Sequence, residues 1–178
     1  MKRTDTSGKN VIIPFTGKCL LASLGLVIMQ ATALAQDCTN KWGGNNEHYF
    51  VNPDGTVTDI DSGLTWMRCA AGQQWNGATC TGAASLLTWD EASRQFTGNN
   101  SPWRLPRLTE LASIVDMHCK APRIDLGLFP ATAPQAYWTV SKAPGNTNQV
   151  YTLSFGAEGV SQAHRTEKHF VRLVRGRD

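Results

Sequence analysis

The sequence has few charged residues, and their charges almost cancel. Of its 178 residues, 17% are Asp, Glu, Lys or Arg, and the formal net charge is +3. Residues 1–35 hold four of the 17 basic and one of the 14 acidic side chains, so the remainder is neutral. Nucleic-acid binding needs a clear basic excess, and we therefore expect no nucleic-acid partner. A hydrophobic content of 41% also excludes a disordered chain.

Sequence patterns that carry catalysis or bind metals are missing as well. There is no CxxC or HExxH spacing, no GxSxG turn and no phosphate-binding glycine loop. The histidines fall in no ligand spacing; they are His48, His118, His164 and His169. We therefore predict a protein that is not an enzyme and has neither a cofactor nor a metal site.

The first 35 residues have the pattern of an export signal. An apolar stretch at 19–29 follows a basic segment and is shorter than the ~20 residues of a membrane span. Ala33-Leu34-Ala35 supplies the small residues that a signal peptidase recognises, which predicts a mature start at Gln36. We expect a protein in the periplasm, outside the cell or on its surface, with no stable membrane insertion after cleavage.

An uncleaved anchor over residues 11–34 is the alternative, which Pro14 and Lys18 disfavour because they interrupt the stretch. After the signal, residues 36–48 are polar and rich in Gly and Asn, which predicts an irregular lead-in. Residues 49–178 are then expected to form a single domain.

Export would place the remaining cysteines in an oxidising compartment, where four cysteines indicate two disulfides with three possible pairings. Cys69 and Cys80 flank a glycine-containing loop, and a bridge between them would contribute about 3 kcal/mol. Cys38 and Cys119 are then the second predicted pair. A four-cysteine metal site is the alternative, and it lacks the usual CxxC spacing.

Turn signals and apolar patterns predict strands at both ends of the domain and helices in the middle. Thr88 and Glu91 form a capping box that starts a helix ending at about Phe96. Apolar residues at helical spacing predict a second helix after Pro106. We expect extended segments at 49–51, 56–58, 64–67, 136–141, 150–155 and 169–174. This order predicts an α+β fold.

Six pieces of sequence occur in an order typical of one family. They are DGTVTD at 54–59 with GLTW at 63–66, TWDEA at 88–92, WRLP at 103–106 with EL at 110–111, ID at 124–125 with FP at 129–130, YWT at 137–139, and VR at 171–172 with VRG at 174–176. Together they resemble the Legionella collagen-like adhesin C-terminal domain family over about residues 49–176.

The resemblance implies a compact domain similar to the C-type-lectin-like and formylglycine-generating-enzyme folds, with two helices, small antiparallel sheets and a loop-rich face. The named member of the family is an adhesin domain that binds sulfated glycans. The sequence departs from the family at Phe96 and Leu173, where members often have cysteines. It also departs at Arg107, where a Thr or Ser helix cap is usual.

The C-terminal segment is the most basic part of the predicted domain. A cationic cluster on a neutral domain suits a sulfated or otherwise acidic glycan, which guanidinium and ammonium groups can bind. The candidate ligand-binding residues in this segment are Arg165, Lys168, Arg172 and Arg175. Each of these side chains could instead lie in solvent or pair with acids elsewhere in the fold.

Trp75 is a further candidate ligand-binding residue, because the predicted Cys69–Cys80 bridge would hold it with little entropy to lose on binding. Trp42 lies in a similar polar segment. Tryptophans inside the family motifs are instead expected to be structural; they are Trp66, Trp89, Trp103 and Trp138. Three aspartates, Asp54, Asp59 and Asp61, allow a calcium site, although turns require the same residue types.

Two functional hypotheses follow from these patterns. The first is an exported, non-catalytic binding module for adhesion, which recognises an acidic polysaccharide or an envelope or surface protein. The alternative is a structural, protein-interaction subunit of an envelope or appendage assembly.

Overall fold

The computed structural model describes residues 48–96, 101–145 and 147–176. Two helices and small antiparallel sheets make up the regular structure of these residues, which confirms the predicted α+β class. The predicted export signal and nearly all of the predicted lead-in lie outside the described residues. Within the described ranges, no helix is both long and apolar enough to span a bilayer.

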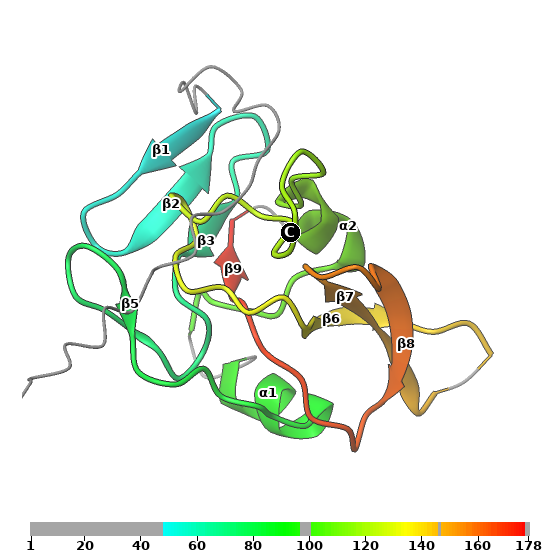
Figure 1. The fold of residues 1–178 in the computed structure, drawn as a ribbon. Coiled ribbons are helices and arrows are strands. Elements are labelled where there is room, and N and C mark those ends of the chain that lie inside the picture. The colour runs from blue at the N-terminus through cyan, green and yellow to red at the C-terminus, as the bar shows by residue number, and fades with distance from the viewer. Residues whose placement is uncertain (1–47, 97–100, 146, 177–178) are drawn as a thin grey trace, which may run out of the picture. The chain divides into compact units, whose positions relative to one another are not determined.

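The first sheet has the strand order β1-β2-β3-β9, with every neighbouring pair antiparallel (Figure 1). Its strands are β1 (Tyr49–Val51), β2 (Thr56–Asp59), β3 (Thr65–Met67) and β9 (Val174–Arg175). The turn between β1 and β2 holds Gly55 at a φ of +81°, and a Cβ there would lie 2.6 Å from the Trp75 side chain. Glycine is required at this turn because of its positive φ and because a Cβ would collide with Trp75.

This sheet contributes the centre of the core. Val57, Trp66 and Val174 are neighbours across β2, β3 and β9, and all three are fully buried. They share one apolar cluster with Leu111 and Phe155. Removing such large side chains from water is the main favourable contribution to folding, and it explains why Trp66 is structural, as predicted.

The second sheet joins β6 (Ala136–Lys142), β7 (Gln149–Ser154) and β8 (Val160–His164) in that order. The predicted segments at 136–141 and 150–155 correspond to β6 and β7. No sequence pattern predicts β8, because only one of its five residues, Ala163, is buried and the strand lacks an apolar alternation. The fully buried Trp138 of β6 belongs to a second apolar cluster beside this sheet.

The first helix, α1 (Trp89–Phe96), begins at the predicted capping box. The Glu91 N–H donates to Thr88 Oγ1 over 3.3 Å, and the Thr88 N–H donates to Glu91 Oε2 over 2.9 Å. Two backbone donors at the helix start are thus satisfied by local side chains.

The second helix, α2 (Leu108–Ser113), is shorter than the apolar spacing predicts. Arg107 stands at its N-cap, and Ser141 of β6 and Glu110 of the helix itself replace the missing Ser or Thr. The Leu108 N–H donates to Ser141 Oγ of β6 over 3.0 Å, and the Arg107 N–H donates to Glu110 Oε2 over 2.7 Å. The start of α2 is therefore tied to the second sheet.

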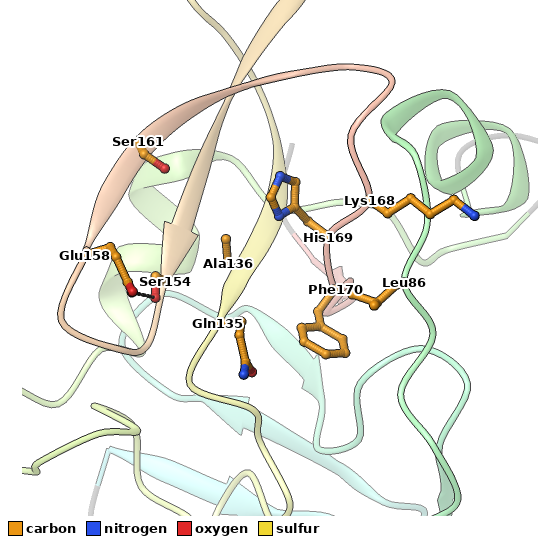
Figure 2. Close-up of a pocket in the computed structure, with 9 residues that line it drawn as sticks. All are labelled: Leu86, Gln135, Ala136, Ser154, Glu158, Ser161, Lys168, His169 and Phe170. Atoms are coloured by element: carbon orange, nitrogen blue, oxygen red, sulfur yellow. Dashed lines mark hydrogen bonds between the residues drawn. The ribbon is translucent and has the colours of Figure 1, made fainter.

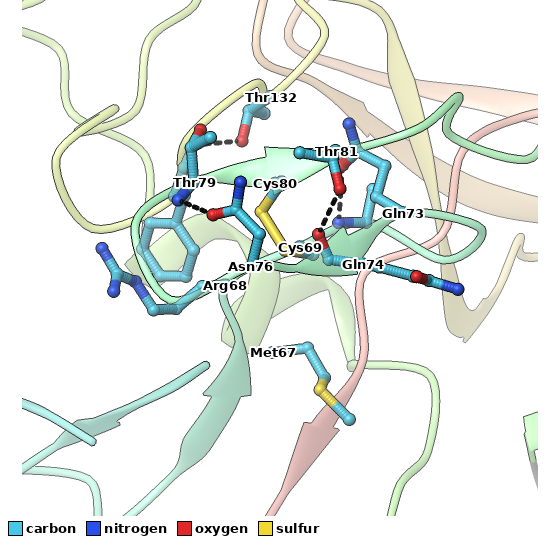
Figure 3. Close-up of a disulfide and its surroundings, with 12 residues drawn as sticks. Met67, Arg68, Cys69, Gln73, Gln74, Asn76, Thr79, Cys80, Thr81 and Thr132 are labelled. Atoms are coloured by element: carbon cyan, nitrogen blue, oxygen red, sulfur yellow. Dashed lines mark hydrogen bonds between the residues drawn. A yellow bond between two sulfur atoms is a disulfide. The ribbon is translucent and has the colours of Figure 1, made fainter. Parts of the chain in front are cut away.

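The predicted disulfide between Cys69 and Cys80 is present (Figure 3), and it closes a loop that contains β4 (Gln74–Trp75) and ends at the first residue of β5 (Cys80–Thr81). Cys119 is buried and disulfide-bonded. Its predicted partner, Cys38, lies outside the described residues, so this second pairing stays a prediction.

The strand predicted over 169–174 does not form. The segment instead makes single bridges to three different parts of the chain, pairing His169 with Leu87, Phe170 with Tyr137 and Val174 with Arg104. Figure 1 shows this segment running from β8 past α1 to β9. Only its last residue, Val174, belongs to a strand, β9 of the first sheet; the residues before it change partners and connect the first and second sheets.

Candidate functional site

A pocket of about 430 Å³ lies between the second sheet and the segment that precedes β9 (Figure 2). We call it the Lys168 pocket. The described residues that line it are Leu86, Gln135, Ala136, Ser154, Glu158, Ser161, Lys168, His169 and Phe170. They come from four separate stretches of sequence, so only folding brings them together.

One wall of the Lys168 pocket is fixed by backbone hydrogen bonds. The N–H of His169 donates to Leu87 O and the Leu87 N–H donates to His169 O, each over 3.0 Å. On the other side of the chain, the Phe170 N–H donates to Ala136 O over 3.1 Å. The Phe170 ring also packs against Tyr137, with centroids 5.4 Å apart. Lys168 therefore extends from a well-anchored segment.

The facing wall is the β7–β8 hairpin, where polar side chains hold one another. The Ser154 hydroxyl lies 2.8 Å from Pro134 O and 2.7 Å from Glu158 Oε2. The hydrogen bond from Ser154 is the main reason that the pKa of Glu158 lies below its usual value. Glu158 is thus a fixed carboxylate that faces the pocket (Figure 2).

His169 of the pocket wall packs on a tryptophan. Its ring meets the Trp138 indole edge-on at a centroid distance of 4.6 Å, and its Nε2 lies 3.6 Å from a Glu167 carboxylate oxygen. Burial lowers the pKa of His169, and the nearby Glu167 only partly opposes this effect. At neutral pH, Lys168 is therefore the main cationic group of this wall.

Arg165 and Arg175 are half-buried and packed on tryptophans. The Arg165 guanidinium pairs with Asp90 and lies 4.3 Å from the Trp89 ring centroid. The Arg175 guanidinium lies 4.7 Å from the ring of Trp103. Neither residue lines the Lys168 pocket, so their role in ligand binding stays a prediction.

Arg172 requires a correction, because it has no exposed surface. Its guanidinium donates to the carbonyls of Met67 and Arg68 over 2.9 and 2.6 Å, and to Thr132 Oγ1 over 2.7 Å. The expectation that Arg172 binds a ligand was wrong, because the segment is buried on all sides here: Val171 and Leu173 are buried together with Arg172. Arg172 supports the fold and cannot contact a ligand from solvent.

Trp75 is half-buried, and one of its faces is occupied. The Arg68 guanidinium lies 4.1 Å from the indole centroid, and Gly55 lies against Cβ, Cγ and Cδ1 of Trp75. Arg68 is itself held by the carbonyls of Leu128 and Gly127 over 2.8 and 2.7 Å. The disulfide-closed loop thus packs Trp75 onto the domain, and its role in ligand binding stays a prediction.

Two of the three aspartates considered for calcium hold turns, and the third, Asp61, lies 2.7 Å from the ring of His48. Asp54 accepts hydrogen bonds from the N–H and hydroxyl of Thr56, and Asp59 accepts from the N–H of Asp61 and the hydroxyl of Ser62. Within the described ranges, no group of three or more His, Cys, Asp or Glu side chains is placed to hold a metal ion.

Most residues of the Lys168 pocket were not found from the sequence. Of the candidate binding residues, only Lys168 lines it. Ser154 ends the predicted strand β7, but Glu158 and Ser161 come from the turn after it and from the unpredicted β8, and Leu86 and Gln135 lie in loops. Serine, glutamate and glutamine in loops carry no specific signal, so only the turn glycines near Glu158 could have indicated a hairpin.

The fold and pocket define a small, disulfide-bonded α+β domain with a preformed pocket of mixed polar and apolar lining. The family model described as Lcl C-terminal domain matches residues 55–175, and the chain belongs to this family. The match agrees with the resemblance carried by the six motifs and is consistent with an adhesin-associated domain. Among curated proteins, none matches the chain in sequence.

Proposed function

We propose that this chain is an exported, non-catalytic adhesin-type domain that binds an acidic carbohydrate in the Lys168 pocket. The observation that carries the proposal is the lining of the pocket, in which Lys168 and Phe170 belong to one wall and the fixed carboxylate of Glu158 belongs to the facing wall (Figure 2). Membership of the Lcl C-terminal domain family and the Cys69–Cys80 disulfide support adhesion and export.

The lining of the pocket matches the chemistry of such a ligand. Leu86 and Phe170 offer apolar surface to the C–H face of a sugar ring, while Gln135 and Glu158 offer groups that hydrogen-bond hydroxyls. Lys168 supplies a point charge for a sulfate or carboxylate. Because both walls are fixed by hydrogen bonds, little ordering is needed when a ligand binds.

Calorimetric titration of the full chain with a heparin-derived hexasaccharide and with uncharged maltohexaose tests the proposal. We expect binding of the sulfated probe alone, weaker as salt rises. Lys168→Ala should weaken it by about three- to tenfold, since a charge-assisted hydrogen bond is lost. Lys142→Ala is the matched control, because Lys142 is an exposed lysine at the far end of β6 that does not line the pocket.

Equal weakening by Lys168→Ala and Lys142→Ala would show diffuse charge attraction in place of a pocket. Absence of binding to both probes at low salt would overturn the carbohydrate proposal. Glu158→Gln adds a second measurement: removing a carboxylate from the pocket should strengthen binding of the sulfated probe about two- to fivefold.

A protein-interaction subunit is the second candidate function. It is favoured by exposed apolar side chains along the β1–β2 region, where Phe50 is 60% and Ile60 is 58% exposed. Co-purification with envelope proteins at high salt, abolished by Phe50→Ser with Ile60→Ser, would support this function. Retention of the partners by the double variant would contradict it.

A further inference from the structure

A second cleft lies between the beginning of β1 and the chain that follows α2. Its volume is about 400 Å³, and it shares no described residue with the Lys168 pocket. Ile114, Leu128 and Phe129 are at most 4% exposed and form its apolar floor, while Met117 is 69% exposed at its rim. We call it the Tyr49 cleft, after the aromatic residue that lines one side.

Carboxylates surround this apolar floor. Asp116 and Asp125 line the Tyr49 cleft, and an adjoining hollow that also contains Tyr49 adds Asp59 and Asp61. Among the described residues that line either hollow, none is a lysine or an arginine. A group that enters the cleft therefore meets apolar surface below and negative charge at the edge.

The hydroxyl of Tyr49 is a measure of this negative potential. Burial, followed by the charges of the four aspartates, raises the pKa of Tyr49 to about 12. Nearby carboxylates have this effect because they disfavour a phenolate. The same potential favours a cation beside the ring, where the aromatic face adds its own attraction for positive charge.

Hydrogen bonds hold these carboxylates in place. Asp59 accepts from the Asp61 N–H over 3.0 Å and from the Ser62 hydroxyl over 2.6 Å, and Asp116 accepts from the His118 N–H over 2.8 Å. These donors are neutral and leave the charge of the carboxylates unchanged, whereas the rings of His48 and His118, which lie 2.7 Å from Asp61 and 3.1 Å from Asp116, add positive charge to the rim only when protonated. The rim is thus charged and preorganised before any ligand arrives.

We propose that the Tyr49 cleft binds a lysine or arginine side chain presented by a partner protein. Both side chains can bury an aliphatic stem on an apolar surface while the cationic head stays among polar groups, which is the arrangement of floor and rim here. Met117 extends the apolar surface beyond the cleft mouth, as contact with a polypeptide requires. The proposal does not depend on the proposed carbohydrate site.

NMR titration of the ¹⁵N-labelled full chain tests this proposal with three probes at about pH 8, where histidine is ordinarily neutral. The probes are a Gly/Ser nonapeptide with three lysines, the same peptide with norleucine in place of lysine, and free spermidine. We expect the lysine peptide to shift the amide signals of residues 113–118 and to bind about tenfold more tightly than the norleucine peptide.

Asp61→Asn combined with Asp116→Asn should weaken binding of the lysine peptide about five- to twentyfold. Asparagine keeps an acceptor oxygen for the His118 N–H, so the local turn is preserved. Glu158→Gln is the control for charge removed at a distance, since it takes one carboxylate from the Lys168 pocket and should leave peptide binding unchanged. Met117→Lys is a second variant, which places a competing cation at the rim and should weaken binding in a folded protein.

Several results would overturn the proposal. Equal affinity for the norleucine peptide would show that charge plays no part, and equal weakening by Glu158→Gln would show a diffuse electrostatic effect. Tighter binding of spermidine than of the peptide, with the same amide shifts, would assign the cleft to a small polyamine.

Discussion

Replacing Arg172 with alanine should destabilise the domain without any direct effect on a ligand. The guanidinium is fully buried and donates three hydrogen bonds, to the carbonyls of Met67 and Arg68 and to the hydroxyl of Thr132. It also lies 4.9 Å from the ring centroid of Phe129. These contacts link the segment before β9 to β3 and to the chain that precedes β6.

The expected loss follows from the groups that alanine would leave behind. Each buried acceptor without a donor costs about 1–3 kcal/mol, and the vacated volume adds a cavity cost. Burial lowers the pKa of Arg172, which shows that its charge is expensive to bury, so alanine removes part of that cost. We expect a net loss of about 3–5 kcal/mol, out of the 5–15 kcal/mol typical of a domain.

Equilibrium urea unfolding with the disulfides intact measures this loss. Arg172→Lys keeps the charge without the planar fork, so we expect about half of the alanine effect. Arg175→Ala is the control: its half-buried guanidinium rests on one ring, and its removal should cost about 1 kcal/mol or less. If Arg172→Ala unfolds within about 1 kcal/mol of the wild type, the buried guanidinium does not support the fold.

Three further changes can be measured in the same unfolding assay. Burial raises the pKa of Glu110, but hydrogen bonds from Arg104 and from a backbone N–H outweigh burial and hold it below its usual value. The stabilisation that the Glu110 carboxylate gives the folded state is therefore present above the unfolded-state pKa and is lost as pH falls through the folded-state pKa. Glu110→Gln should lower the free energy of unfolding by about 1–3 kcal/mol at pH 7. A loss of the same size at acid pH would contradict this prediction. Cys69→Ser with Cys80→Ser should cost about 3 kcal/mol, and equal stability of the wild type with and without reductant would argue against it. Thr88→Ala should lower the free energy of unfolding by about 1 kcal/mol, because α1 loses its N-cap hydroxyl. Thr88→Ser keeps a hydroxyl, so an equal loss in that variant would contradict this reason.

Local signals in the sequence predicted local structure well. The capping box at Thr88 and Glu91 starts α1, and Cys69 and Cys80 form the predicted bridge. These features depend on residues at most eleven positions apart, so the residue types and their spacing carry the information. Strand β8 had no such signal, because its side chains are mostly exposed.

Features that depend on distant contacts were not predictable in the same way. The carbonyls that hold Arg172 belong to residues more than a hundred positions earlier, and a carbonyl carries no residue-specific signal. A count of charges along the segment therefore treats Arg172 and Lys168 alike. The structure separates them, since one is sealed in the interior and the other extends at the edge of a pocket.

The difference between arginine and lysine explains this separation. Three arginines lie over tryptophan rings, pairing Arg68 with Trp75, Arg165 with Trp89 and Arg175 with Trp103. A guanidinium is planar and weakly hydrated, so it can pack on an indole, whereas the strongly hydrated ammonium of lysine stays in water. The arginines are thus largely committed to the fold, and substituting them lowers stability in a way that imitates lost binding. Lysine and aspartate substitutions at the rims of the two pockets separate binding from folding.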